Sequence, residues 1–213
     1  MKRLFLTSST HQVSKHWVQH IDLDKENKLA FITTPADGEI GDKQWLADDR
    51  TSLINVGFTV TDYTIVGKNS QELLTELAAF DILYVSGGNT FYMLQQSHIS
   101  GFFEAVHTLV EERGKVYVGT SAGSIIAGPR LPEYLLNLGE QLIEKKFVDG
   151  TGFGFVNFIL LPHWGSESFK SRYLESRINR LYSSSQYPIL LLTDFQYVQV
   201  EGDSVKIIDT SRL

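Results

Sequence analysis

The chain contains 213 residues, carries a formal net charge of −6 and has no cysteine. This acidic balance disfavours a nucleic-acid-binding protein, which normally presents a basic face, and a chain without cysteine has no disulfide, thiolate metal site or thiol nucleophile. Hydrophobic residues make up 42% of the chain, as in an ordinary globular protein, and the length suffices for one well-buried domain. We therefore expect a single domain over residues 1–213, located in the reducing cytoplasm.

The first half of the chain alternates short apolar runs with amphipathic segments. We expect strands over residues 4–6, 29–33, 58–65, 81–85 and 116–118, and helices over 11–21, 43–55, 70–79 and 91–112. Ser70 is the predicted N-cap of the third helix, and the fourth is expected to break near residues 97–101. The apolar run before Thr7 is too short for the core of a signal peptide, and no run reaches the length of a membrane span. Repeated β-then-α units of this kind indicate a mostly parallel sheet with helices on both faces.

The pattern changes after Gly128. Pro129 and Pro132 end a helix, and residues 133–150 lack a regular hydrophobic period. We interpret them as an excursion with a short helix or hairpin that partly covers the ligand site expected at the edge of the sheet. Beyond it we expect a strand over 155–161, a helix over 166–181 and strands over 189–193, 197–200 and 205–208. Residues 202–203, Gly-Asp, provide the turn of a C-terminal β-hairpin. The carboxyl ends of the parallel strands then meet at one edge of the α/β sheet, where ligand sites collect.

Residues 119–123, Gly-Thr-Ser-Ala-Gly, form the most informative motif. They lie between a predicted strand and a predicted helix, which is the setting of a nucleophile elbow with Ser121 exposed on a tight turn. A side chain at Gly119 or Gly123 would clash with the neighbouring strand and helix, and the helix N-terminus would place N–H groups beside the hydroxyl. A serine nucleophile that forms an acyl-enzyme fits this arrangement. The alternative is a chance match in which Ser121 is only a helix N-cap.

A serine nucleophile needs a general base, and histidine is the usual one. His163 follows an apolar run that ends at Pro162, so it should emerge at the same sheet edge as Ser121; the alternative is a packing histidine. Asp194 follows the next predicted strand and is a candidate to orient the imidazole, although an aspartate before a hairpin is often only a turn residue. The chain order Ser121, His163, Asp194 differs from the Ser-Asp-His order of the α/β-hydrolases and disfavours that fold.

The tetrahedral intermediate of acyl transfer requires hydrogen-bond donors for its oxyanion. The N–H of Ala122, next to the nucleophile, is the first predicted donor, and the loop Gly87-Gly88-Asn89 is expected to supply a second. This chemistry requires no metal or organic cofactor. His11, His16 and His20 have the loose spacing of a metal pair, but no carboxylates accompany them at ligand spacing, so we expect no metal site.

Taken together, these segments resemble the peptidase E (dipeptidase E, or aspartyl dipeptidase) family of serine peptidases, which includes cyanophycinase-like relatives. The similarity covers nearly the whole chain and runs through residues 4–9, 84–91, 117–124, 161–163 and 192–196. The resemblance implies a fold like the class I glutamine amidotransferase domain, with Ser121 as nucleophile, His163 as base and Asp194 as orienting acid. It also implies an oxyanion hole formed by Gly88 and Ala122, with Asn89 at the edge of the substrate.

The better-known members of this family cleave dipeptides that begin with Asp, and such a substrate needs a cation in the site. Dipeptidase E has an Arg just before the acid, whereas this chain has Thr193. Arg130, Lys170 and Arg172 are candidate cations by their place in the sequence, and each is also typical of a surface charge.

We therefore expect a serine exopeptidase that hydrolyses short peptides as a monomer or homodimer, without nucleic-acid or membrane partners. One alternative is a hydrolase of another acyl class that uses the same three residues. The other is a non-catalytic α/β protein that binds a small anion at the Gly-Gly loop and the Ser121 helix.

Overall fold

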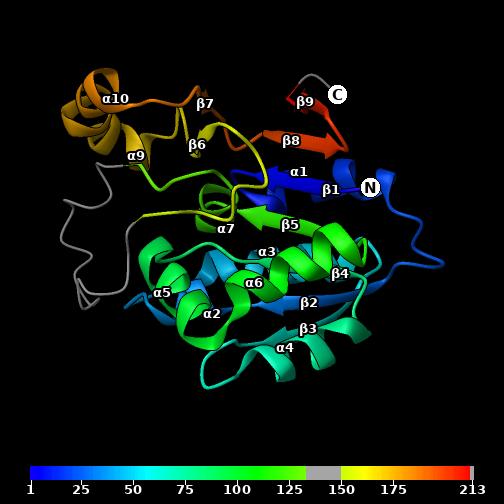
Figure 1. Cartoon of the computed structure of the whole chain (residues 1–213). Helices are drawn as coiled ribbons and strands as arrows, with labels where there is room; N and C mark the ends of the chain where they lie inside the picture. Colours follow the sequence, from blue (N-terminus) through cyan, green and yellow to red (C-terminus); the bar gives the residue numbers. More distant parts are fainter. Residues whose placement is uncertain (133–149, 212–213) are drawn as a thin grey trace.

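A seven-stranded sheet runs through the centre of the computed structural model, which describes residues 1–132 and 150–211 (Figure 1). The strands follow the order β3-β2-β4-β5-β1-β8-β9. Their bounds are β1 Arg3–Thr7, β2 Lys28–Ile32, β3 Thr59–Tyr63, β4 Ile82–Val85, β5 Val116–Thr120, β8 Gln196–Glu201 and β9 Ser204–Asp209. Strands β1 to β5 pair in parallel, whereas β8 is antiparallel to both β1 and β9. The predicted α/β class is confirmed, as is the C-terminal hairpin, whose turn is Gly202-Asp203.

Helices cover both faces of this sheet, as the alternation of elements predicted (Figure 1). Successive strand residues point to opposite faces, so Phe5 and Tyr84 enter one core and Leu4 and Leu83 the other. The first core includes residues from α1 (Thr10–Trp17) and α3 (Gln44–Asn55). The second includes residues from α4 (Ser70–Glu76), α5 (Thr90–Ser100) and α6 (Phe102–His107). This layered packing holds the carboxyl ends of β1, β4 and β5 at a fixed edge.

Two helix ends show how local sequence sets the boundaries. The predicted break in segment 91–112 is confirmed: α5 ends at Gly101, whose φ of 73° favours glycine, and α6 is followed by a π-helical turn over Thr108–Glu112. The predicted N-cap of α4 was wrong by one residue. Asn69, not Ser70, accepts the N–H groups of Gln71 and Glu72, while Glu72 accepts the Asn69 N–H in a capping box.

The predicted strand 155–161 is shorter than expected and leaves the main sheet. Only β6 (Ile159–Leu161) forms, and it pairs in parallel with β7 (Ile189–Leu191) in a separate two-stranded sheet. In the described structure, the backbone just before β6 makes no strand pairing with the main sheet. Instead, the N–H groups of Phe153 and Phe155 donate to the carbonyls of Ile126 and Ala127 at 2.7 and 2.9 Å. These bonds tie the segment to the end of α7 (Ala122–Ile126) in place of a neighbouring strand.

The remaining elements are short. The predicted helix 166–181 is divided into α9 (Glu167–Arg172), a π-helical turn (Tyr173–Arg177) and α10 (Ile178–Ser184). The other short helices are α2 (Thr34–Asp37) and the 3₁₀ segments Val18–His20 and Leu77–Ala79. Among the helices of the described residues, none has the length and apolar character needed to cross a membrane.

Candidate active site

Ser121 lies between β5 and α7 at the carboxyl edge of the main sheet. Its backbone adopts φ 48° and ψ −106°, a conformation that costs a non-glycine residue about 1–3 kcal/mol and persists only where neighbours impose it. The Ser121 N–H donates to the carbonyl of Thr7 at 3.0 Å, and the Gly123 N–H donates to the carbonyl of Ser86 at 3.2 Å. The residues at the ends of β1 and β4 therefore hold the turn that presents the hydroxyl.

Gly119 and Gly123 allow backbone segments to approach closely around this turn. A Cβ on Gly119 would lie 2.5 Å from the carbonyl oxygen of Gly123. A Cβ on Gly123 would lie 2.2 Å from the carbonyl oxygen of Val85. Both separations are well inside van der Waals contact, so the prediction that side chains would clash at these two positions is confirmed.

His163 follows a strand of the two-stranded sheet, and its side chain contacts Ser121. It lies two residues beyond β6, is half-buried, and its Nε2 is 3.0 Å from Ser121 Oγ. The ring of Phe169, on α9, stacks on the imidazole with centroids 4.3 Å apart. His163 has φ 64°, and within the described residues it and Ser121 are the two non-glycine residues with positive φ. Backbone strain of this kind concentrates at functional sites.

Asp194 continues the chain of contacts from His163. Its Oδ1 is 2.7 Å from His163 Nδ1, and the same oxygen accepts the Ser8 hydroxyl at 2.6 Å. Burial by itself raises the pKa of Asp194, but hydrogen bonds with His163 and Ser8, assisted by the charges of His163 and His11, lower the pKa below its ordinary value. Asp194 is therefore ionised near neutral pH. An ionised carboxylate can only accept, so it favours the imidazole tautomer with hydrogen on Nδ1 and a lone pair on Nε2 facing Ser121.

Two backbone N–H groups near Ser121 have no acceptor among the described residues. Across residues 1–132 and 150–211, no hydrogen bond uses the N–H of Gly88 or of Ala122. The Gly87-Gly88 loop lies against the nucleophile, because a Cβ on Gly87 would be 3.4 Å from Ser121 Cβ. Gly88 has φ 124°, and a Cβ there would be 2.4 Å from a carbonyl oxygen of α2, so this turn requires glycine.

Asn89 is buried, and its side-chain oxygen accepts the Tyr92 N–H at 2.9 Å as the N-cap of α5. Capping accounts for an asparagine at this position without any ligand. The predicted role of Asn89 at the substrate edge stays a prediction.

Sequence reasoning missed Ser8, which contacts His163 and Asp194, and Trp45, which lies at the Gly87-Gly88 loop. Ser8 is 1% exposed and hydrogen-bonds to both His163 and Asp194. Its signal was the hydroxyl-rich run after the first strand, which topology places at the carboxyl edge. Trp45 of α3 has its indole edge 3.3 Å from the point that a Gly87 Cβ would occupy. Helical spacing predicted its helix but could not show that the ring reaches the Gly-Gly loop.

His11 pairs with a buried carboxylate, not with another histidine. Its Nδ1 is 2.9 Å from Asp49 Oδ1, while the Tyr84 hydroxyl donates to Asp49 Oδ2 at 2.8 Å. The hydrogen bond with Asp49 raises the pKa of His11, although partial burial opposes the shift. Burial, followed by the charge of Asp49, raises the pKa of Tyr84 well above its usual value. Within the described residues, no group of three or more His, Cys, Asp or Glu side chains is placed to hold a metal ion.

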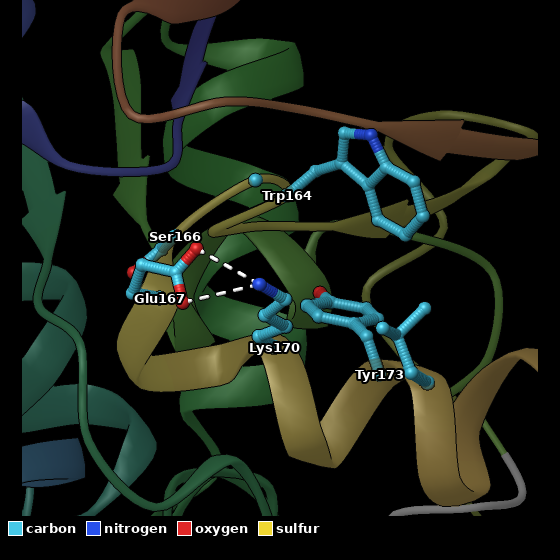
Figure 2. A pocket seen from close by; sticks show the side chains of 7 residues that line it. Trp164, Ser166, Glu167, Lys170 and Tyr173 are labelled. Atoms are coloured by element: carbon cyan, nitrogen blue, oxygen red, sulfur yellow. Dashed lines mark hydrogen bonds and ion pairs between the residues drawn. The ribbon is translucent and has the colours of Figure 1, made fainter.

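A cavity of about 250 Å³ is lined by residues that follow His163 in the sequence, beginning with Trp164 (Figure 2). Its wall includes the rings of Trp164 and Tyr173, which meet edge to face with centroids 5.5 Å apart. Lys170, also in the wall, donates to both carboxylate oxygens of Glu167 at 3.1 and 3.3 Å (Figure 2). The side chains of Ser121, His163 and Asp194 do not line it, so the cavity does not contain the reacting atoms.

The three candidate cations lie at the surface. Lys170 is paired with Glu167, Arg130 is exposed, and Arg172 is exposed with its guanidinium 5.1 Å from the Phe169 ring centroid. These positions do not identify the cation that an N-terminal Asp would need. The excursion expected over residues 133–150 falls outside the described residues, apart from Gly150.

Comparison with known proteins gives one consistent result. Residues 4–208 match peptidase family S51. The chain is 31% identical over 196 residues to an uncharacterised peptidase of Listeria monocytogenes (89% of this chain, 91% of the relative), and 28% identical over 216 residues to peptidase E of Streptomyces coelicolor (94% and 81%). A solved structure of a Listeria monocytogenes protein provisionally named peptidase E matches with a TM-score of 0.82, 26% identity and coverage of 99% of this chain and all of that one.

Proposed function

The chain belongs to peptidase family S51 and is a serine peptidase, and from this premise we propose that it hydrolyses short peptides through Ser121, His163 and Asp194. One observation carries the proposal: a continuous hydrogen-bonded chain, 3.0 Å from Ser121 Oγ to His163 Nε2 and 2.7 Å from His163 Nδ1 to Asp194 Oδ1. Both separations are within ordinary hydrogen-bond range. The backbone strain at Ser121 and His163 supports the same assignment.

In the proposed acylation step, Ser121 Oγ attacks the scissile carbonyl carbon while its proton passes to His163 Nε2. The carbonyl oxygen, on which negative charge develops, accepts hydrogen bonds from the N–H groups of Gly88 and Ala122, which no other group uses in the described structure. Asp194 accepts the Nδ1–H bond and stabilises the imidazolium that forms. His163 then gives the Nε2 proton to the leaving amine nitrogen, and the C–N bond breaks to leave an ester on Ser121.

Deacylation repeats the sequence with water as the nucleophile. Water loses a proton to His163 Nε2 as its oxygen attacks the ester carbonyl, and the same two N–H groups stabilise the second oxyanion. His163 returns the proton to Ser121 Oγ as the C–O bond breaks. The carboxylic acid product leaves, and the enzyme regains its starting protonation state.

The substrates we propose are dipeptides and other short peptides, in keeping with the resemblance to the peptidase E family. An N-terminal Asp is one member of this class. Its carboxylate would need a cation, and the surface positions of Lys170, Arg130 and Arg172 leave that cation unassigned. The residue preference therefore has to be measured across a panel of substrates.

The test is hydrolysis of a Xaa-Ala dipeptide panel, including Asp-Ala, together with labelling by a fluorophosphonate. We expect cleavage and labelling by the wild type, and a loss of about a million-fold or to background in Ser121→Ala. Ser97→Ala is the matched control, because it removes a buried hydroxyl that donates to a helix carbonyl at 2.8 Å in α5. Labelling without cleavage of any dipeptide would move the proposal to another acyl substrate. Absence of both would overturn the catalytic role of Ser121.

A further inference from the structure

The proposed active site is divided between two sheets. Ser121 follows β5 in the seven-stranded sheet, whereas His163 and Asp194 follow β6 and β7 in the two-stranded sheet. Proton transfer between Ser121 and His163 therefore depends on contacts that fix one sheet against the other. The end of β1 makes such contacts through adjacent residues: the Thr7 carbonyl accepts the Ser121 N–H, and the Ser8 side chain contacts His163 and Asp194.

We propose that Ser8 is a positioning residue that holds the His163–Asp194 pair against Ser121 and fixes the tautomer of the imidazole. This inference rests on the function proposed above. Ser8 Oγ accepts the backbone N–H of His163 at 2.7 Å and donates its proton to Asp194 Oδ1 at 2.6 Å. One hydroxyl thus fixes the backbone of the base and the side chain of the acid. Its burial, with 1% of the residue exposed, keeps water from competing for either bond.

The protons around Ser8 determine which imidazole nitrogen carries hydrogen. A serine hydroxyl has one proton, and Ser8 uses it to donate a hydrogen bond to Asp194, which as a carboxylate can only accept. His163 Nδ1 faces Asp194 Oδ1 at 2.7 Å and Ser8 Oγ at 3.3 Å, so neither neighbour has a proton to offer it. Nδ1 must therefore carry the hydrogen. Nε2 is left with its lone pair toward Ser121, as a general base requires.

The same hydroxyl holds His163 in its unusual backbone conformation. His163 has φ 64°, a left-handed value that a residue with a Cβ rarely adopts. The N–H of His163 is bound by Ser8, and the next N–H, that of Trp164, is bound by the carbonyl of Leu192 at 2.9 Å. Without the Ser8 bond, the N–H of His163 would lose its acceptor, and the backbone here would keep the Trp164 bond and the bond from the Ser166 N–H to the His163 carbonyl at 3.2 Å. Its ring would then be held near Ser121 only through Asp194, which would itself have lost the Ser8 bond, and through the stacked ring of Phe169.

Ser8→Ala tests this role, with Ser8→Cys as a second variant that preserves side-chain volume and replaces the hydroxyl by a weak thiol donor. Each is compared with Ser97→Ala, which loses a buried hydroxyl with no bond to the active site. We measure kcat and KM on the preferred peptide, the rate of fluorophosphonate labelling of Ser121, and the melting temperature. Labelling reports the reactivity of Ser121 without a contribution from peptide binding.

We expect Ser8→Ala to lower kcat and the labelling rate together by about 10- to 100-fold, as for a misplacement of about 1 Å, with KM nearly unchanged. Ser8→Cys should lie between Ser8→Ala and the wild type. In an Asp194→Ala background, the further loss from Ser8→Ala should be much smaller, because both act through His163.

Equal kcat and labelling rates in Ser8→Ala and Ser97→Ala would overturn the inference while leaving the proposed function intact. If Ser8→Ala fails to fold, kcat of Ser8→Cys is the test. A folded Ser8→Cys variant with the kcat of the wild type would overturn the inference in the same way. A wild type that neither cleaves peptides nor labels at Ser121 would instead overturn the proposed function. The two failures are therefore distinguished in one set of measurements.

Discussion

Gly123→Ala tests whether the Ser121 turn is packed as closely as the structure shows. The new Cβ would lie 2.2 Å from the Val85 carbonyl oxygen and 3.1 Å from Val85 Cβ. Carbon and carbonyl oxygen come into ordinary contact at about 3.3 Å, so α7 and β4 must separate by about 1 Å. Overpacking of this kind costs about 1–3 kcal/mol, and each kcal/mol lowers the melting temperature of a chain of this size by about 2–4 °C. A displacement of Ser121 by about 1 Å should also lower kcat about 100-fold.

Gly87→Ala is the matched control for this substitution. Its Cβ would lie 3.3 Å from the ring edge of Trp45, a side chain that can shift, and 3.4 Å from Ser121 Cβ, an ordinary van der Waals contact, with no backbone clash. We expect Gly87→Ala to melt within a few degrees of the wild type and to keep kcat within about ten-fold. Thermal melts by circular dichroism and peptide hydrolysis would measure both effects. If Gly123→Ala melts and turns over like Gly87→Ala, the close approach of α7 to β4 is not required and our reasoning about the turn is wrong.

Two further predictions concern residues around the site. The hydrogen bond with Asp49 raises the pKa of His11 in the folded state. The His11–Asp49 pair therefore stabilises the fold fully below the pKa of about 6.5 that His11 has in the unfolded chain, and this contribution is lost as the pH rises through the folded-state pKa. The urea-unfolding difference between the wild type and His11→Gln should therefore be larger at acid than at alkaline pH, and a difference independent of pH would contradict it. Trp45→Ala should raise KM about ten-fold for peptides with a large apolar residue and leave kcat unchanged, because the indole lies at the Gly-Gly loop beside Ser121. An equal change in KM for small and large residues would refute a role for Trp45 in binding.

The main sheet could be predicted because its strands are short apolar runs separated by amphipathic helices. The limits of that reasoning appear at segment 155–161, which has the apolar pattern of a strand but of which only Ile159–Leu161 pairs. At its start, the N–H groups of Phe155 and Val156 instead donate to the carbonyl of Ala127 at the end of α7, a tertiary contact that the local sequence pattern does not reveal. The error at the N-cap of α4 has another origin. Asn69 and Glu72 have the spacing of a capping box, and this spacing is visible in the sequence.

The residues proposed for catalysis could be predicted because Ser121, His163 and Asp194 each follow an apolar run that forms a strand. Position at a strand end is visible in the sequence, and the structure brings the three side chains together. Ser8 and Trp45 could not be assigned in this way. Their contacts depend on which strand lies next to which and on how a helix is rotated, and both are properties of the assembled sheet.

Strain explains why so many contacts converge on the end of β1. A positive φ at a non-glycine residue costs about 1–3 kcal/mol, whereas one hydrogen bond contributes only about 0.5–1.5 kcal/mol. Ser121 and His163 both have positive φ, so each needs restraints from more than one neighbour. Thr7 binds the backbone N–H of the first and Ser8 that of the second, at 3.0 and 2.7 Å. Two consecutive residues thus help to hold both strained residues, and a change in the path of β1 beyond Phe5 would weaken the restraints on Ser121 and His163 together.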